Sequence, residues 1–280
     1  MLIEQSARFQ PIKNRQAVSG LDYAYYVVPG AHIYTSACLS GKMTTRFYVS
    51  IVISPHCTPF ELSVSGKSAP YEAAAIKPLA QSGKNLIDGP LFTLHLEPSH
   101  RHFRRFHFIP SPGVLRIDRS LFTPFDAELQ AACNGQLALE DAARLIDRMV
   151  VVATNLLPEP PPPDSRLIKV CELLRSEPNI SLSDVAAQLD LSYERTSHLF
   201  TEAMGLPFRS YQLWRKVRRA NRLLWSGQSL TAAAHGAGFA DSAHLCRIFQ
   251  QVFARPPSYF YDRRFVKIIA AEQRSTISIL

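Results

Sequence analysis

Side chains able to ligate a metal ion gather in one short segment. They are His95, Glu97, His100, His102 and His107. Two histidines and a carboxylate form a ligand set that a catalytic transition metal accepts, and His95 and Glu97 would share one face of a strand. However, a Pro-Ser pair follows directly, and the arginines among these residues would repel a cation. We therefore expect no metal and no catalytic residue here, but a solvated loop with packed imidazoles.

A second segment has the chemistry of a nucleic-acid contact. No acidic residue occurs between Glu202 and Asp241, and the basic residues in that interval are Arg209, Arg215, Lys216, Arg218, Arg219 and Arg222. Such a stretch favours a polyanionic partner. Taken alone it would more simply be a solvated helix face, so its interpretation depends on the elements around it.

Composition limits the class of protein. The chain has 280 residues, 46% of them hydrophobic, which suffices for two domains with cores and excludes disorder throughout. A net charge of +8 is too small for a polybasic tail. The longest apolar run, 149–157, cannot cross a membrane, and the polar segment 1–20 predicts no signal peptide. Five scattered cysteines without a CxxC pair fit the reducing cytoplasm, where we expect this protein.

A proline-rich segment divides the chain. Four successive prolines favour a stiff, extended backbone, so we expect a first domain at 1–157, a linker at 158–164, a second domain at 165–262 and a tail at 263–280. Within the first domain, β-branched and aromatic runs predict strands at 23–28, 47–53, 60–64, 71–76 and 91–96. Helices are predicted at 125–133 and from Leu139 to Leu156, the second with one apolar stripe.

The second domain contains an internal repeat. The segment starting at Ser181 recurs 48 positions later at Ser229, and Leu199-Phe200 recurs 49 positions later at Ile248-Phe249. Each copy predicts a helix-turn-helix. We expect Ser165, Ser181, Ser192, Ser229 and either Asp241 or Ser242 to begin helices as N-caps. Gly205 and Gly238 are expected to end or turn them.

A single long helix is predicted between the two copies. It would run from about Pro207 to Ser226, with aromatic and aliphatic residues inward and basic residues outward. Twenty residues at about 1.5 Å each span about 30 Å. Two recognition helices held about one duplex turn apart would enter successive major grooves. In this context, Arg209, Arg215, Lys216 and Arg219 are predicted to contact phosphates without reading sequence.

The repeat resembles the DNA-binding domain of AraC/XylS-family transcription regulators. The resemblance is carried by 182–200, Gly205 and above all 238–249, followed by the proline-containing close at 254–258. Four positions depart from the family pattern, and they are Thr196, His198, Ala254 and Tyr261. We expect a looser first recognition helix, a different end to the second and one phosphate contact fewer.

The resemblance implies which residues face DNA. In the first recognition helix these are Glu194, Arg195, Ser197 and His198. In the second they are Ser242, Ala243, His244, Cys246 and Arg247, although Cys246 is more simply structural. Arginine can hold guanine, glutamate can accept from cytosine and alanine can touch a thymine methyl.

The resemblance also implies a fold and partners for the whole chain. We expect an α+β protein, in which a strand-rich, cupin-like β-barrel with two flanking helices precedes an all-α domain with two helix-turn-helix units. The first domain would bind a small effector, and the stripe from Leu139 to Leu156 would either pair across a homodimer or pack on its own barrel. DNA is the main partner, with RNA polymerase if the protein activates. The alternative is a cupin-type, metal-dependent enzyme fused to a DNA-binding module.

Overall fold

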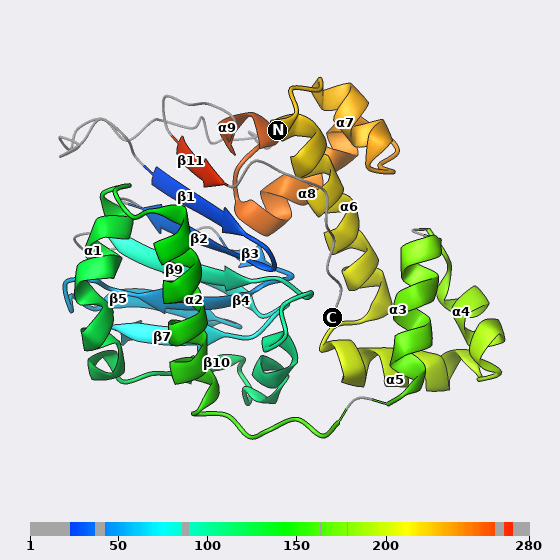
Figure 1. The fold of residues 1–280 in the computed structure, drawn as a ribbon, viewed down its shortest axis with the longest axis horizontal. Coiled ribbons are helices and arrows are strands. Elements are labelled where there is room, and N and C mark those ends of the chain that lie inside the picture. The colour runs from blue at the N-terminus through cyan, green and yellow to red at the C-terminus, as the bar shows by residue number, and fades with distance from the viewer. Residues whose placement is uncertain are drawn as a thin grey trace, which may run out of the picture.

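The computed structural model describes residues 23–36, 43–85, 90–162, 164–177, 179–260 and 266–270. A strand-rich domain lies beside a helical domain (Figure 1). The larger sheet has seven strands in the order β10-β7-β4-β9-β2-β1-β11. Along the chain these are β1 (Tyr23–Val28), β2 (Ala31–Ser36), β4 (Val49–Ile53), β7 (Ala73–Ile76), β9 (Leu91–Leu96), β10 (Val114–Arg116) and β11 (Val266–Ala270). Neighbouring strands run antiparallel from β10 to β1, whereas β11 runs parallel to β1.

A smaller sheet packs against the first. Its order is β3-β8-β5-β6, formed by β3 (Thr44–Thr45), β8 (Gln81–Asn85), β5 (Phe60–Val64) and β6 (Lys67–Tyr71). Alternate residues of β5 are buried, as expected for a strand with one covered face. Phe60, Leu62 and Val64 pack with Val52 and Ile76 between the two sheets. The predicted α+β class with a sheet-rich first domain is therefore confirmed.

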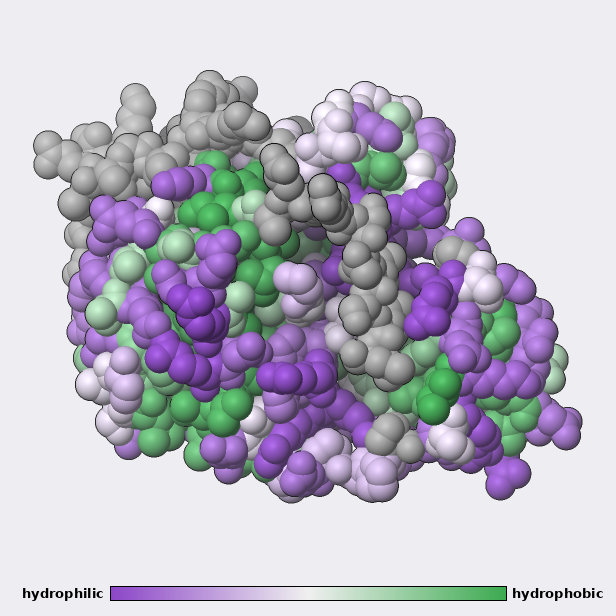
Figure 2. All heavy atoms as spheres, viewed as in Figure 1, coloured by the Kyte–Doolittle hydropathy of each residue, from purple (hydrophilic) through white to green (hydrophobic). Residues whose placement is uncertain are grey.

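Helices α1 (Asp126–Cys133) and α2 (Leu139–Thr154) cover a face of the larger sheet (Figure 1). The apolar stripe of α2, including Leu145, Ile146 and Met149, is buried there. The stripe is thus covered by the chain's own sheet, which is the second of the two alternatives expected for it. The face of α2 turned outward is hydrophilic (Figure 2) and carries Arg144 and Asp147.

The start of the helical domain differs in detail from the prediction. The segment 158–162 connects α2 to α3 (Arg166–Ser176) (Figure 1). Ser165 precedes α3 but its side chain makes no capping bond. Asp164 accepts from the Arg166 backbone N–H instead, at 2.9 Å. The predicted Ser165 cap is therefore wrong, because Ser165 already has helical backbone angles (φ −57°, ψ −27°), whereas a capping residue is usually extended.

Two similar pairs of helices lie at opposite ends of one long helix (Figure 1). The first pair is α4 (Leu182–Leu189) and α5 (Tyr193–Met204), and the second is α7 (Leu230–Gly236) and α8 (Ser242–Phe253). The long helix is α6 (Phe208–Trp225), and the short α9 (Pro257–Phe260) follows α8. At about 1.5 Å per residue, the 18 residues of α6 span about 27 Å.

Each helix of the two pairs begins at a polar cap. Ser181 and Asp184 form a capping box at α4, and Ser192 accepts from Arg195 N–H at α5. Ser229 caps α7 and Asp241 caps α8 in the same way. These caps satisfy amides that would otherwise lack partners, which explains why the repeat in the sequence produces the repeat in the structure.

The predicted tail contains a strand. β11 lies within 263–280 and pairs with β1 from Tyr23↔Val266 to Val27↔Ala270. Val266 is 3% exposed, and the Lys267 ammonium donates to the Gly135 carbonyl at 2.8 Å. The segment that follows the helical domain thus returns to the sheet of the first domain and completes its edge.

Two predictions concern residues outside the described part of the chain. These are the lack of a signal peptide in 1–20 and the lost phosphate contact at Tyr261. Within the described residues, no helix combines the length and the apolar character needed to span a membrane.

Candidate nucleic-acid interface and interdomain pocket

The first recognition helix presents a polar outer face. Glu194, Arg195 and His198 are exposed on α5, and Ser197 is half-buried. Thr196 points the other way and is fully buried, with its hydroxyl donating to the Ser192 carbonyl at 2.9 Å. Its hydroxyl therefore has a partner within the first turn, and α5 runs without interruption from the predicted Ser192 cap to the predicted end at Gly205.

The second recognition helix presents a smaller polar face. Ala243 and Arg247 are exposed on α8, whereas Ser242, His244 and Cys246 are half-buried. The His244 ring packs edge-on against the buried Phe239, with 5.3 Å between ring centroids. Arg247 is thus the charged side chain of this set that lies exposed on α8.

The end of α8 keeps the left-handed turn that glycine usually supplies. Ala254 has φ +57° and ψ +18° and its N–H bonds to the Gln250 carbonyl. The expectation that alanine changes this helix end is wrong, because the turn forms despite the Cβ, at some cost in strain.

The basic residues of α6 have different environments. Arg209 and Arg219 are exposed. Arg215 is half-buried, and burial lowers its pKa. The Lys216 ammonium donates to the Gly238 carbonyl at 2.9 Å, so it also braces the turn before α8. Arg218 faces the strand-rich domain rather than solvent, which corrects the prediction that all basic residues point away.

The cluster of histidines does not form one site. His95 lies on β9 inside the sheet domain, where its Nδ1 is 2.9 Å from the Ser50 hydroxyl. Glu97 lies 3.3 Å from Arg218 of α6, and the His100 and His102 rings face each other at 5.8 Å. In the part of the chain that the structure describes, no group of three or more potential ligands is suitably placed for a metal ion.

A pocket lies where the two domains meet, and we call it the interdomain pocket. It is lined by Tyr25, His32, Tyr34, Arg46, Lys84, His95, Phe253, Ala254, Arg255 and Phe260. The first six belong to the sheet domain and the last four follow from the end of α8. Its empty volume is about 740 Å³, part of which is open to solvent.

Burial controls the charges in the interdomain pocket. It lowers the pKa of His32 to about 3, with Arg218 and Arg46 adding to the effect, and the pKa of His95 falls well below its usual range for the same reason. Both imidazoles are therefore neutral at pH 7. Burial also lowers the pKa of Arg46 to about 10 and that of Lys84 well below its ordinary value.

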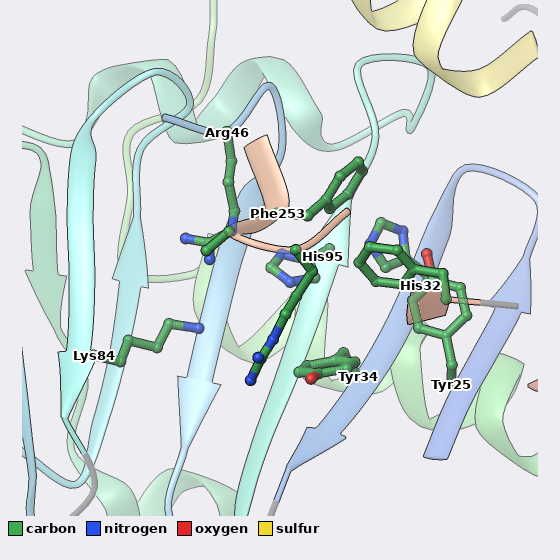
Figure 3. Close-up of a pocket in the computed structure, with 10 residues that line it drawn as sticks. Tyr25, His32, Tyr34, Arg46, Lys84, His95 and Phe253 are labelled. Atoms are coloured by element: carbon green, nitrogen blue, oxygen red, sulfur yellow. The ribbon is translucent and has the colours of Figure 1, made fainter. Parts of the chain in front are cut away.

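The lining has a cationic side and an aromatic side. Lys84 and Arg46 lie on one side in Figure 3, and Phe253, His32 and Tyr25 lie on the other. Sequence analysis did not find this pocket, because its residues are spread over several strands and both domains. The register His32↔His95 between β2 and β9 brings the two imidazoles together, and their rings lie 4.8 Å apart.

Known proteins resemble the two parts of the chain to different extents. Residues 185–263 match a family described as helix-turn-helix domain. The arabinose operon regulatory protein of Salmonella typhimurium is 28% identical over 120 residues, covering 41% of this chain and 42% of the relative. The Escherichia coli protein of the same name is 27% identical over 41% and 40%. This chain thus matches about two fifths of the length of these curated relatives.

One solved structure shares the fold over most of the chain. ToxT from Vibrio cholerae O395 has a TM-score of 0.51 and 13% sequence identity, covering 81% of this chain and 95% of that one. At this identity the likeness concerns the fold alone. The sequence matches over the helical domain confirm its resemblance to AraC-type regulators.

Proposed function

We propose that this chain, whose helical domain is of the AraC type, is a sequence-specific DNA-binding transcription regulator. The observation that carries the proposal is the arrangement of two helix-turn-helix units at the ends of α6, each with an exposed polar face on its second helix (Figure 1). Recognition helices placed in this way dock into the major groove, and cations beside them contact phosphates. Such a protein acts in the cytoplasm, where DNA is accessible.

We propose two roles for the exposed arginines of the helical domain. Arg195 on α5 and Arg247 on α8 project from recognition helices and are proposed to read base edges. Arg209 and Arg219 on α6 are proposed to bind phosphates, which gives affinity without sequence preference. Lys216 is held by the Gly238 carbonyl, so its part is to fix the turn before α8 and to add charge.

We further propose that the sheet domain binds a small effector in the interdomain pocket. One ToxT structure is described as bound to an unsaturated fatty acid, and another as bound to (E)-4-(8-methylnaphthalen-1-yl)but-3-enoic acid. The fold shared with ToxT and the pocket at the domain boundary support an effector role here. RNA polymerase is a partner if the regulator activates.

The alternative of a metal-dependent enzyme is not favoured. It depended on His95 and Glu97 acting together. His95 instead bonds Ser50 inside the domain, and Glu97 pairs with Arg218 of the helical domain. Both residues therefore have structural partners that account for them.

Genome-wide footprinting of the full chain tests the regulator proposal and yields its operator. On that operator, log affinity should fall linearly with log salt concentration, and binding should exceed that to random DNA by at least about 1000-fold. Equal affinity for operator and random DNA would contradict sequence-specific regulation.

Substitutions separate the two proposed roles. Arg195→Ala and Arg247→Ala should each weaken operator binding by roughly 1–3 kcal/mol and random DNA by much less. Arg219→Ala should weaken both equally. Arg144→Ala on the outer face of α2 is the matched control and should change neither.

A further inference from the structure

We propose that Tyr193, at the start of the first recognition helix α5, is a phosphate contact, in which the phenol hydroxyl donates to a phosphate oxygen of operator DNA. The inference rests on the proposed DNA-binding function and adds to it a residue that the sequence did not single out. A contact of this kind fixes how the helix lies on the duplex without reading a base.

Tyr193 has an aromatic side chain that is open to solvent. It is 53% exposed, and the only other exposed aromatic side chain among the residues that the structure describes is Phe108, at 39%. Within that same part of the chain, Tyr193 has no hydrogen bond, ion pair or ring contact through its side chain. A single exposed ring is ordinary on a protein surface, and its place on α5 is what links this one to DNA.

Tyr193 lies at the edge of the outer face of α5. The side of the helix that packs inside its unit is formed by Thr196, Leu199, Phe200 and Ala203. At about 3.6 residues per turn, Glu194 and His198 lie opposite that side, whereas Tyr193 lies beside it in the first turn. A helix in the major groove turns the middle of its outer face to the bases and its edges to the two backbones. The position of Tyr193 therefore suits a phosphate better than a base.

The end of α5 that carries Tyr193 is far from the contact with the sheet domain. That contact is at the other end, where the Arg104 guanidinium donates to the Glu202 carbonyl at 3.2 Å. Tyr193 lies nine residues before Glu202, which is about 14 Å along the helix axis. The packing of the two domains therefore leaves Tyr193 accessible to a partner as large as a duplex.

The charges of α5 favour a neutral donor at this place. The helix carries one arginine, Arg195, and two carboxylates, Glu194 and Glu202, whereas α8 carries Arg247 and no acidic residue. The two carboxylates weaken the attraction of α5 for the phosphates. A phenol hydroxyl donates a hydrogen bond without a charge, so Tyr193 holds the first recognition helix to the backbone where its net charge does not.

The second unit shows that the fold does not require a tyrosine here. At the 49-residue offset of the repeat, the counterpart of Tyr193 is Ser242, which is half-buried. Both α5 and α8 have 12 residues and begin at a polar cap, so the helix forms with either residue in its first position. The exposed ring of Tyr193 is therefore free to serve binding.

Salt titration of DNA binding by the full chain tests the contact. Tyr193→Phe removes only the hydroxyl, and it should weaken binding to operator and random DNA alike by about 3- to 10-fold, as expected for one neutral hydrogen bond. Because the hydroxyl is uncharged, the slope of log affinity against log salt concentration should not change. Arg219→Ala should instead make that slope shallower by about one. Tyr71→Phe, on strand β6, is the matched control and should bind DNA as the unmodified chain does.

A second measurement locates the phosphate. The phosphates of the operator are replaced one at a time by neutral methylphosphonates, and each DNA is bound to the unmodified chain and to Tyr193→Phe. At one phosphate, the replacement should weaken the unmodified chain more than the variant, because the variant has already lost that contact. If the two losses add at every phosphate, Tyr193 contacts none of them and the proposal is wrong.

Three other results would also overturn the proposal. Unchanged DNA binding by Tyr193→Phe would exclude the hydrogen bond. A loss of affinity for the operator but not for random DNA would indicate a base contact instead. A lower unfolding midpoint for Tyr193→Phe would show that the hydroxyl supports the fold.

The measurement on random DNA does not depend on operator recognition. A chain that binds random DNA without preferring an operator would contradict the proposed regulator, while the effect of Tyr193→Phe could still be measured. Operator-specific binding that Tyr193→Phe leaves intact would overturn only the role of Tyr193. A chain that binds neither DNA would overturn both proposals.

Discussion

Arg218 of the helical domain lies against Glu97 of the sheet domain, with 3.3 Å between Nη1 and Oε2. The Glu97 side chain is 13% exposed and that of Arg218 35%. Burial raises the pKa of Glu97, and the guanidinium opposes that effect. Arg218 also lies over the Trp214 ring at 5.6 Å. One arginine of the basic helix therefore joins the two domains instead of facing DNA.

Removing Arg218 should destabilise the protein more than removing an exposed neighbour. Arg218→Met leaves the buried Glu97 carboxylate without a counter-ion, which should cost about 1–2 kcal/mol given the partial exposure of Arg218. Glu97→Gln in the same chain should recover part of this loss. Urea unfolding measures both. Arg219→Met, on the exposed side of α6, is the control, and an equal loss there would contradict a specific role for the pair.

Stability should fall as the pH drops below about 6.5. Burial lowers the pKa of His32 to about 3 and that of His100 to about 4, against an ordinary value near 6.5. Between these values the unfolded chain binds more protons than the folded one, so acid favours unfolding. Each histidine contributes up to about 1.4 kcal/mol to the free energy of unfolding per pH unit.

Unfolding midpoints measured from pH 7 to pH 4 test whether stability falls as the pH drops. His32→Phe keeps a ring among Tyr25, Tyr48 and His95, so it should make the pH dependence shallower. His198→Gln on the exposed face of α5 should leave the dependence unchanged. A His32→Phe profile parallel to that of the unmodified chain would refute the assignment.

Two helix ends should gain stability from glycine. Asp190 ends α4 with φ +53° and Ala254 ends α8 with φ +57°, where Gly205 ends α5 at +69°. A Cβ costs free energy in this conformation, and glycine removes that cost but adds entropy to the unfolded chain. We expect Asp190→Gly and Ala254→Gly each to stabilise by about 0.5 kcal/mol.

Thermal unfolding of the two glycine variants measures this gain. Thr201→Gly within α5 is a control in which glycine should have the opposite effect. It should destabilise the protein by roughly 0.5 kcal/mol, since glycine is unfavourable in a helix interior. Destabilisation by Ala254→Gly would show that its methyl group contributes more through packing in the interdomain pocket than its backbone costs.

Elements with strong local signals could be predicted from the sequence. β1, β5 and β9 match the predicted ranges, and α5 begins after the predicted Ser192 cap and ends at the predicted Gly205. Strands with alternating apolar residues and helices with a polar cap carry their information within a few neighbouring residues. Both helix-turn-helix units could therefore be predicted from the sequence.

Other strands lacked such signals. β8 has the sequence QSGKN and β6 contains Pro70, so neither resembles a typical strand. Both form because β5 lies between them and supplies their partners. Their placement depends on pairing between distant segments, which composition does not reveal.

The interdomain pocket could not be predicted for the same reason. Arg46 and Lys84 are far apart in the sequence, and their neighbours, Thr45 and Phe47 for the first and Gly83 and Asn85 for the second, form no motif. Lys84 lies on β8 and Arg46 directly follows β3, its partner in the smaller sheet, and Phe253 lies beside them because α8 packs against β3. The histidines between 95 and 107 stand out in the sequence because they are close together. Nothing in the sequence around Lys84 indicates that this lysine is buried beside a pocket.

Strand β11 offers a direct test of how the domains are held together. It follows the helical domain in sequence but pairs with β1 of the sheet domain, and Ile269 packs against the shared core. Removing residues 266–280 would expose the edge of β1 and loosen the link between the domains. We expect a lower unfolding midpoint, because the pairing of β11 with β1 and the packing of Ile269 are lost. Removing only residues 271–280 keeps β11 and should leave the unfolding midpoint unchanged. If the two truncations behave alike, β11 does not hold the domains together.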